Sequence, residues 1–349
     1  MRFFNLLIIT MLLLIFSSCN GTKSDTSPSF VLKINTDKKD FTQNDTLSFT
    51  LETRKGNAPD SVKYTLKGTE VKVFDNKLPL KQIPLGNHNF NAEVFRDGEK
   101  EVLQKKITVL SSVKPKIYTL KILNEYPHNR SSYTQGLEFY GDTLYEGTGR
   151  YKESKLKKTD FKTGETYKEI QLEDNQFGEG ITILNDKIYQ LTWQNNEGFI
   201  YELQTFKKIK SFPYSKSKEG WGLTNDGEKL YKSDGTEKIW ILNKETLKEE
   251  DYIQVTSNTK IYNKVNELEY VDGKIYANSY QNDGIMIIEA STGALLGVVD
   301  GRVLKNKVLK HNQLDVLNGI AYHHERKAFF LTGKYWNKLF EVTFEEKAK

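Results

Sequence analysis

Five polar or aromatic side chains recur at a near-constant interval through the larger, C-terminal part of the sequence. The steps between them are 44, 42, 45 and 52 residues, and the residues are Gln135, Glu179, Trp221, Asn266 and Asn318. A second series follows at the same phase: Thr148, Trp193, Asp234, Tyr280 and Lys334. A hydrophobic core does not need this mixture of carboxylates, amides, rings and a cation, and a solvated surface would not repeat it in phase. We therefore expect the two series to converge on a site for a polar substrate.

Glu179 is the strongest candidate for acid/base chemistry. Gly178 and Gly180 flank it, and we expect these glycines to permit close approach of a substrate backbone. In a funnel lined by Trp193 and Trp221, loss of water would raise the pKa of this carboxyl group toward the range useful for proton transfer.

Two other charged side chains accompany this carboxyl group in the sequence. Lys334 could neutralise Glu179 or bind a substrate oxygen. Glu219 is a weaker candidate, because it stands two residues before Trp221 and so falls outside the series.

The segments that must position these residues form a repeat. Each copy has one strand-like segment, a tight polar turn and a second strand-like segment, as in residues 179–189. A repeat of about 45 residues with about four strands is typical of a propeller blade. Five copies predict an all-β chain with a five-bladed β-propeller, in which equivalent residues of the innermost strands meet near one mouth of a central channel.

Two details at the ends of this repeat can also be predicted. Residues 117–122 precede the first copy and are expected to supply the outer strand of the last blade, which closes the ring and removes free sheet edges. The adjacent His323 and His324 are expected in an exposed hairpin turn of the fifth copy rather than in a metal site.

A smaller β domain is predicted before the propeller. Residues 29–112 contain short segments of alternating apolar and polar residues separated by turn residues, a pattern typical of an immunoglobulin-like sandwich. No acid/base cluster occurs in it, so a spacer or docking role is expected. The propeller domain is assigned to residues 116–349.

The first residues are interpreted as a targeting segment. Met1-Arg2 precedes an apolar run over residues 3–16, which is too short for a comfortable membrane span and fits a signal peptide over residues 1–18. Ser17-Ser18-Cys19 resembles a bacterial lipobox, which implies cleavage before Cys19 and lipid attachment to its sulfur. Residues 19–28 would form a tether. We expect an exported protein anchored by lipid to a bacterial membrane, on its periplasmic or cell-surface side; an ordinary secretory signal is the alternative.

Composition limits the partners and cofactors. The 349 residues carry a formal net charge of +5, with no basic stripe, so nucleic acid is not expected as a partner. The one cysteine, Cys19, excludes an intramolecular disulfide and a zinc site of several thiolates. We expect a monomer.

Several motifs resemble the plant- and bacterial-type glutaminyl-peptide cyclotransferase family. The resemblance covers roughly residues 118–343 and does not include the N-terminal β domain. It is carried by Tyr126-Pro127-His128, Tyr133-Thr134-Gln135-Gly136-Leu137, Tyr145-Glu146-Gly147-Thr148-Gly149, Phe177-Gly178-Glu179-Gly180-Ile181-Thr182, Leu191-Thr192-Trp193, Glu219-Gly220-Trp221-Gly222-Leu223, Ser233-Asp234-Gly235-Thr236, Leu268-Glu269-Tyr270 and Leu331-Thr332-Gly333-Lys334-Tyr335-Trp336.

This resemblance implies a five-bladed propeller that converts the N-terminal glutamine of peptides to pyroglutamate and releases ammonia. It implies that Glu179 is the acid/base and that the site also contains Gln135, Trp193, Trp221, Asn266 and Lys334. Tyr280 stands where the family commonly has Trp, and Tyr133 where Phe is usual; Asn318 completes the expected substrate-binding set. No cofactor or metal is required, although a structural calcium ion is compatible with the family.

Two other functions remain open from the sequence alone. A calcium-dependent lactonase or esterase would use Glu179, Asn266 and Asn318 as oxygen ligands. A non-catalytic propeller would bind an N-terminal glutamine without turnover. Turnover of a lactone substrate that vanishes with a chelator would favour the first, and binding without ammonia release the second.

Overall fold

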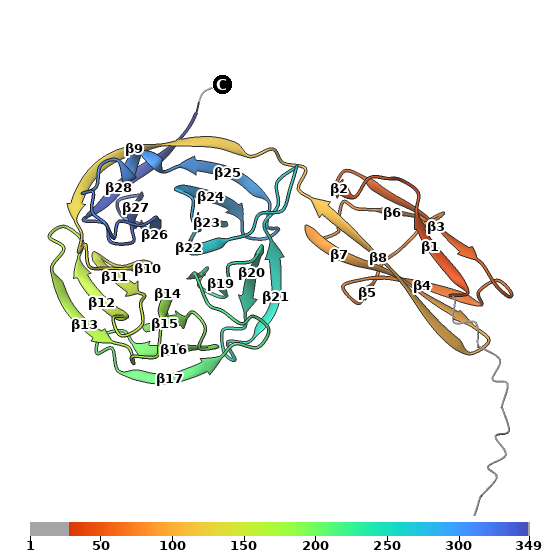
Figure 1. Cartoon of the computed structure of the whole chain (residues 1–349), viewed down its shortest axis with the longest axis horizontal. Helices are drawn as coiled ribbons and strands as arrows, with labels where there is room; N and C mark the ends of the chain where they lie inside the picture. Colours follow the sequence, from red (N-terminus) through yellow and green to blue (C-terminus); the bar gives the residue numbers. More distant parts are fainter. Residues whose placement is uncertain (1–27, 348–349) are drawn as a thin grey trace, which may run out of the picture.

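The computed structural model describes residues 28–347, whose regular secondary structure is almost entirely β-strand. Strands β1–β8 form an N-terminal pair of sheets, and strands β9–β28 form a ring of sheets (Figure 1). The only helix within these residues is the short α1 (Arg302–Lys305). The all-β class predicted from the sequence is confirmed. The predicted leader, Cys19 and nearly all of the tether lie outside the described residues.

The N-terminal sheets contain three and five strands and enclose one core. Alternate residues of β7 are buried, as a strand with one face on a core requires. Leu47, Phe49 and Phe90 lie at the centre of that core. The three-stranded sheet has the order β1 (Phe30–Ile34), β3 (Thr46–Thr53) and β6 (Lys77–Pro79). The other sheet has the order β2 (Asp40–Thr42), β8 (Glu99–Leu110), β7 (Gly86–Arg96), β4 (Ser61–Leu66) and β5 (Thr69–Glu70).

The ring contains five groups of four antiparallel strands, and each group is called a blade below (Figure 1). Blade 1 is β10 (Thr134–Tyr140), β11 (Thr143–Thr148), β12 (Lys155–Asp160) and β13 (Thr166–Gln171). Blade 2 is β14 (Gly178–Leu184), β15 (Lys187–Thr192), β16 (Glu197–Glu202) and β17 (Lys208–Pro213). Blade 3 is β18 (Leu223–Asn225), β19 (Leu230–Ser233), β20 (Lys238–Leu242) and β21 (Glu249–Gln254).

The last two blades are joined through one long strand. Blade 4 is β22 (Val265–Val271), β23 (Lys274–Ser279), β24 (Gly284–Glu289) and β25 (Leu295–Asp300). Blade 5 is β26 (Leu317–His323), β27 (Ala328–Gly333), β28 (Lys338–Glu346) and β9 (Lys116–Pro127). Strand β9 pairs antiparallel with β28, as predicted, and its first residues also pair in parallel with β25. The second pairing was not predicted.

The first strands of the blades contact one another in a closed circuit, β10–β14–β18–β22–β26–β10. Glycines allow this contact. A Cβ atom on Gly180 would lie 2.6 Å from the Trp221 carbonyl oxygen, and one on Gly222 would lie 2.1 Å from the Asn266 carbonyl oxygen. The prediction that the glycines beside Glu179 make room for a substrate is therefore wrong, because neighbouring protein backbone occupies that room: a Cβ on Gly178 would meet the Thr148 carbonyl oxygen at 2.7 Å.

In four blades the residue of the first series is followed by a glycine, and in blade 4 it is followed by Glu267; the glycines are Gly136, Gly180, Gly222 and Gly319. The Glu267 carboxylate is fully buried and accepts hydrogen bonds from Leu137 N at 3.2 Å and Ile320 N at 2.9 Å. These donors belong to blades 1 and 5, so one side chain connects three blades at the axis.

In the fifth repeat the structure differs from the prediction that both His323 and His324 lie in an exposed turn. His323 is the last residue of β26, is buried, and has its Nε2 atom 2.9 Å from an Asp142 carboxylate oxygen. His324 alone lies in the exposed turn. The prediction of an exposed turn is wrong for His323, which packs against Phe139.

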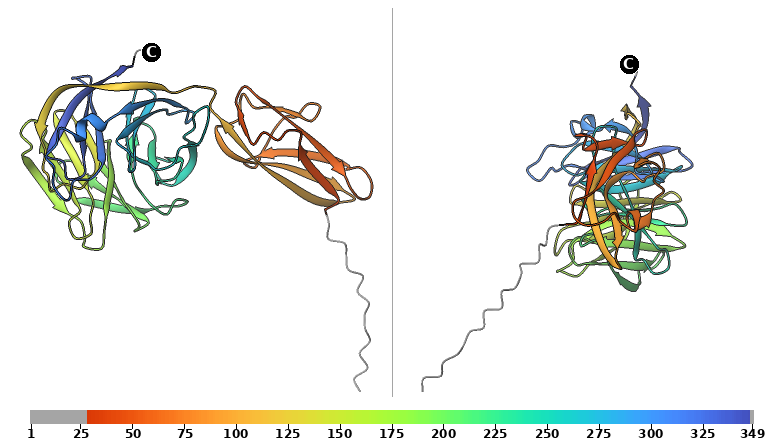
Figure 2. Two further views of the ribbon diagram at one scale, coloured as in Figure 1. Left: turned by 45° about the horizontal axis from the view of Figure 1, so that its top comes forward. Right: turned by 90° about the vertical axis from the view of Figure 1, so that its right-hand side faces the viewer.

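The N-terminal sheets contact the ring beside blades 3 and 4 (Figure 2). The Gln254 carboxamide oxygen accepts a hydrogen bond from Asn87 N at 2.7 Å, and Ser111 N donates to the Thr256 hydroxyl at 3.2 Å. Gly86 has φ +108°, and a Cβ atom on it would lie 1.9 Å from that Gln254 oxygen. Across residues 28–347, none of the helices has the length and apolar character needed to cross a membrane.

From the raised pKa values of two further carboxyl groups, those of Glu138 and Glu269, we expect the stability of the protein to depend on pH. Burial raises the pKa of Glu138 to about 8, and burial together with the Glu138 charge raises that of Glu269. A folded-state pKa above the unfolded value means that stability is full below the unfolded pKa and is lost as pH rises through about 8. We expect Glu138→Gln to flatten the decline in Tm of the wild-type protein between about pH 5 and pH 9. Parallel Tm curves for the two proteins would contradict this assignment.

Candidate active site

Four side chains from the first strands of four blades form one chain of hydrogen bonds. Asn266 Nδ2 donates to Asn318 Oδ1 at 2.8 Å, Asn318 Nδ2 donates to Gln135 Oε1 at 3.1 Å, and Gln135 Nε2 donates to Glu179 Oε1 at 2.7 Å. All four are buried. Every donor points the same way, so the chain of amides ends on the carboxyl group of Glu179.

The environment of Glu179 favours its protonated form. Burial raises the pKa of this carboxyl group well above its usual value, and the nearby charge of Glu219 raises it further. The Lys334 charge and the Gln135 hydrogen bond oppose this rise without cancelling it. A buried carboxyl group that holds its proton to higher pH can both accept and return a proton near neutrality.

Glu219 connects the two tryptophans predicted for the site. Its Oε2 atom accepts hydrogen bonds from the indole Nε1 atoms of Trp193 and Trp221, each at 2.9 Å. Gln194 Nε2 donates to its other oxygen at 3.1 Å. Glu219 therefore fixes the orientation of both indoles and also acts on the pKa of Glu179, which is a larger role than the sequence analysis assigned to it.

Further aromatic rings pack against these two tryptophans on both sides, and the whole row of rings is called the aromatic wall below. Trp193 lies 5.5 Å from Phe177, and Phe177 lies 6.1 Å from Tyr133, between ring centroids. On the other side, Trp221 lies 5.2 Å from Tyr280 in an edge-to-face arrangement at 79°. Edge-to-face packing of this kind holds each ring against its neighbour.

Lys334 lies between Tyr133 and Tyr280, which stand at the two ends of the aromatic wall. Its Nζ atom lies 4.5 Å from the centroid of Tyr133 and 5.4 Å from that of Tyr280. Burial lowers its pKa, while the charges of Glu179 and Asp315 oppose the change. Within the described part of the chain its ammonium group makes no hydrogen bond or direct ion pair, so Lys334 acts on Glu179 by charge at a distance.

Further groups surround Tyr133 at the edge of the site. The Arg150 guanidinium lies 4.0 Å from the Tyr133 ring centroid and donates to the Tyr335 hydroxyl at 3.3 Å. Tyr133 donates its own hydroxyl proton to Asp315 at 3.4 Å. Arg150 has φ +96° and Tyr335 has φ +62°, which are unusual for residues other than glycine and mark a strained rim.

Two members of the predicted second series make hydrogen bonds within their own blades. Thr148 uses its hydroxyl to accept from Lys155 N at 2.9 Å and so joins β11 to β12. Asp234 accepts from the Trp240 indole at 2.7 Å and from Thr236. Asp234 also lines a surface pocket together with Glu219 and Trp221, so it lies beside the aromatic wall without a hydrogen bond to it.

Comparisons with known proteins show the family of the chain. A sequence model of the glutamine cyclotransferase family matches residues 99–344, the range that contains every residue named in this subsection. The chain belongs to the glutamine cyclotransferase family. A glutaminyl-peptide cyclotransferase of Arabidopsis thaliana is 37% identical over 234 residues, which are 66% of this chain and 73% of the relative. The glutaminyl cyclase of Myxococcus xanthus has a crystal structure that matches with a TM-score of 0.63 and 30% identity, covering 67% of this chain and all of that one.

The structure brings the nine residues predicted for the catalytic and substrate-binding set together, and it places further residues beside them that the sequence analysis missed. Gln135, Glu179, Asn266 and Asn318 form the polar chain, while Tyr133, Trp193, Trp221, Tyr280 and Lys334 form the wall. Phe177, Arg150, Asp315 and Tyr335 were missed. Phe177 directly precedes Gly178-Glu179 in the sequence, and only this position could have indicated that it belongs to the site.

Replacing Glu219 tests its effect on the wall. Both indoles donate to one oxygen of Glu219; glutamine can keep that acceptor, but it loses the negative charge and presents an NH2 group to Gln194 in place of the other oxygen. Glu219→Gln should therefore lower kcat/KM of the cyclotransferase by about 10- to 100-fold, the cost of losing hydrogen bonds to a charged acceptor. Because the Glu219 charge raises the pKa of Glu179, the acid limb of the pH–rate profile should also move to lower pH. Tryptophan fluorescence should report the loosened indoles.

Asp234→Asn is a matched control for this variant. It changes a carboxylate in the same blade that also accepts an indole hydrogen bond, from Trp240, but none from Trp193 or Trp221. We expect its pH–rate profile to match the wild type. An acid limb that stays in place in Glu219→Gln would contradict the electrostatic link to Glu179.

Proposed function

We propose that this cyclotransferase converts the N-terminal glutamine of peptides and proteins to pyroglutamate and releases ammonia, with Glu179 as the acid/base. The observation that carries the proposal is the directed amide chain that ends on a buried carboxyl group inside an aromatic wall. Such an arrangement would hold a small polar side chain folded back on its own amine and keep water from it.

The reaction needs one nucleophile, which the substrate supplies. The neutral α-amine attacks the side-chain carboxamide carbon, and a new C–N bond closes the five-membered ring. Ionised Glu179 takes a proton from the attacking amine. It then gives that proton to the carboxamide nitrogen, whose bond to carbon breaks as ammonia leaves. Proton, electron pair and leaving group balance without a further reactant.

Negative charge develops on the carboxamide oxygen during this attack. Lys334 is the best-placed donor for it, because its buried ammonium group lies against the Tyr133 and Tyr280 rings and has hydrogens to donate. Gln135 and Asn266 each use one amide hydrogen in the chain and keep a second for the substrate. Donors aimed at the developing oxyanion lower the barrier most in a site that excludes water.

These residues supply acid/base and oxyanion chemistry themselves, so we propose that the reaction is independent of a metal ion. The alternative lactonase would need free oxygens on Glu179, Asn266 and Asn318. Here the Asn318 oxygen accepts from Asn266, and a Glu179 oxygen accepts from Gln135. Two of the oxygens that a calcium ion would need are therefore already engaged, which favours the cyclase.

Replacing the proposed acid/base is the direct test. Glu179→Gln should lower ammonia release from a Gln-initiated peptide by about 10²- to 10⁴-fold, the usual contribution of general acid/base catalysis, with an unchanged circular dichroism spectrum. Wild-type turnover should persist in a chelator. Near-normal activity of the variant would remove Glu179 from the mechanism, and ammonia release that stops with a chelator would contradict the metal-independent reaction. Chelator-sensitive turnover of a lactone in place of the peptide would favour the lactonase.

We further propose that the enzyme acts outside the cytoplasm on a lipid anchor at Cys19. The proposal rests on the apolar run over residues 3–16 followed by Ser17-Ser18-Cys19. Expressed with its leader in a bacterial host, the wild type should fractionate with membranes and incorporate labelled fatty acid, whereas Cys19→Ala should do neither. Equal fractionation of the two proteins would favour an ordinary secretory signal.

A further inference from the structure

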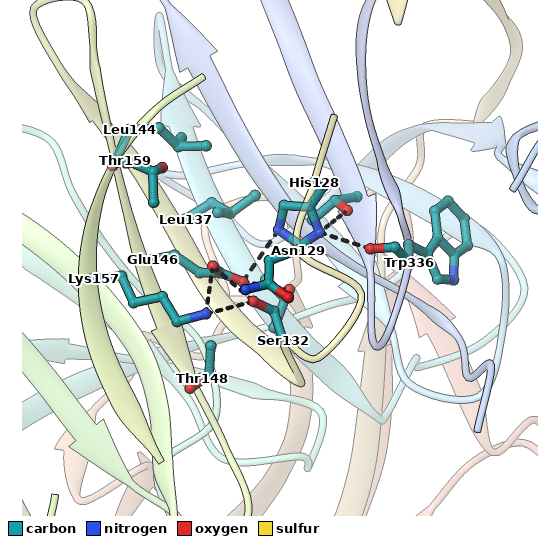
Figure 3. Close-up of polar contacts among 12 residues, drawn as sticks. His128, Asn129, Ser132, Leu137, Leu144, Glu146, Thr148, Lys157, Thr159 and Trp336 are labelled. Atoms are coloured by element: carbon teal, nitrogen blue, oxygen red, sulfur yellow. Dashed lines mark hydrogen bonds and ion pairs between the residues drawn. The ribbon is translucent and has the colours of Figure 1, made fainter. Parts of the chain in front are cut away.

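A buried ionic cluster lies next to the active site and is absent from the mechanism above (Figure 3). Glu146 of β11 lies at its centre. Ser132 donates to Glu146 Oε2 at 3.2 Å, and Thr134 donates to Oε1 at 2.7 Å. Lys157 Nζ lies 3.6 Å from Oε2 and donates to the Ser132 hydroxyl at 2.6 Å, and His128 Nε2 lies 3.3 Å from Oε1.

The residue types are those of a hydrolase, but the cluster is closed to substrates. Ser132 is 1% exposed, Glu146 2% and Lys157 4%. The serine hydroxyl is held between Lys157 and Glu146 and faces no open space for an acyl group. A role through neighbouring residues is therefore the better explanation.

The first neighbour is the segment that enters β10. Ser132 and Thr134 stand on either side of Tyr133, and both bind Glu146 through their hydroxyls. Gln135, the next residue, donates to Glu179. The carboxylate of Glu146 thus fixes the backbone of the segment that carries one wall residue and the last amide of the polar chain.

The second neighbour is the turn that follows β27. Tyr335 N donates to the Ser132 carbonyl oxygen at 2.7 Å, and His128 N donates to the Asn337 carbonyl oxygen at 3.1 Å. The His128 Nδ1 atom lies 2.9 Å from the Trp336 carbonyl oxygen. A carbonyl oxygen only accepts, so Nδ1 carries a proton. Lys334 begins this turn, and the cluster therefore holds it as well.

The charge state of Glu146 suits this role. Burial alone would raise the pKa of Glu146, but Lys157 and His128 lower it to about 2. A carboxyl group with so low a pKa is held as the carboxylate, the form that accepts from the Ser132 and Thr134 hydroxyls.

We propose that Glu146 is a positioning residue for the cyclotransfer reaction. By holding the segment before β10 and the turn after β27 against each other, it places Gln135 and Lys334 at the correct separation for the substrate carboxamide. This inference rests on the proposed function and names a residue that touches neither substrate nor reacting atoms. A displacement of about 1 Å at such a distance from the chemistry can cost about 10²-fold in rate.

Three variants separate positioning from stability. Glu146→Gln keeps an acceptor oxygen but leaves the Lys157 charge buried without its partner, so both Tm and kcat should fall, kcat by about 10- to 100-fold. The double variant Glu146→Gln/Lys157→Met removes the unpaired charge and should recover much of the Tm without recovering kcat. Ser132→Ala removes one hydroxyl and no charge, and should lower kcat several-fold even if the Glu146 variants do not fold.

Glu341→Gln is the matched control. Glu341 is 2% exposed and is held by Arg326 at 2.8 Å, Asn124 and Tyr126, none of which belongs to either segment. We expect its kcat to stay within about twofold of the wild type, because its loss moves no active-site group.

All variants are assayed beside the wild type for ammonia release from the same Gln-initiated peptide. A wild type without turnover would overturn the proposed function, and with it this role. A working wild type whose Glu146→Gln variant keeps its kcat, or whose double variant recovers kcat together with Tm, would overturn the positioning role alone. A Glu341→Gln variant that loses as much kcat as Glu146→Gln would do the same.

Discussion

The close approach of the five innermost strands at the axis of the ring determines the rest of the structure. Gly136, Gly180, Gly222 and Gly319 leave no room for a Cβ atom against the neighbouring strand. This contact brings the residue before each of them toward the axis, so Gln135, Glu179 and Asn318 meet although they are far apart in the sequence. Glu267 replaces the fifth glycine and joins three blades through backbone hydrogen bonds. The same packing that closes the ring therefore assembles the polar chain of the site.

Burial at that axis makes every polar group dependent on its neighbours. An unpaired amide or charge in such a place is costly, so the amides of Asn266, Asn318 and Gln135 satisfy one another in series. The series has a direction, and its last donor faces Glu179. Lys334 has aromatic faces around it instead of a carboxylate at contact distance, which leaves its hydrogens free for a substrate oxygen. Stability and reactivity thus arise from one set of contacts.

The sequence alone predicted the site residues that recur at the interval of the blades. It missed the site residues that are defined by contacts between blades. The spacing of Gln135, Glu179, Asn266 and Asn318 was sufficient because a propeller brings equivalent positions together. It could not show that Glu219 turns back to both indoles, or that Arg150 covers Tyr133, because side-chain direction across blades leaves no periodic signal. Alternation of residue types predicted the strands, yet the parallel pairing of β25 with β9 joins segments more than a hundred residues apart. Asp234 is in phase as well, but its carboxylate accepts from Trp240 instead of joining the amide chain, which its spacing could not show.

Two buried glutamates of this enzyme, Glu146 and Glu179, show how surroundings divide one residue type into two roles. Both lose water, and that loss alone would raise the pKa of each carboxyl group. Lys157 and His128 lie within 4 Å of Glu146 and reverse the effect, so this carboxylate is a permanent anion that can only hold its neighbours. Glu179 has an amide donor and a more distant lysine, which leave the pKa raised. A carboxyl group that must exchange a proton, such as Glu179, needs partners that leave its pKa high enough for the proton to return. A carboxylate that must hold two segments together, such as Glu146, needs partners that keep it from being protonated.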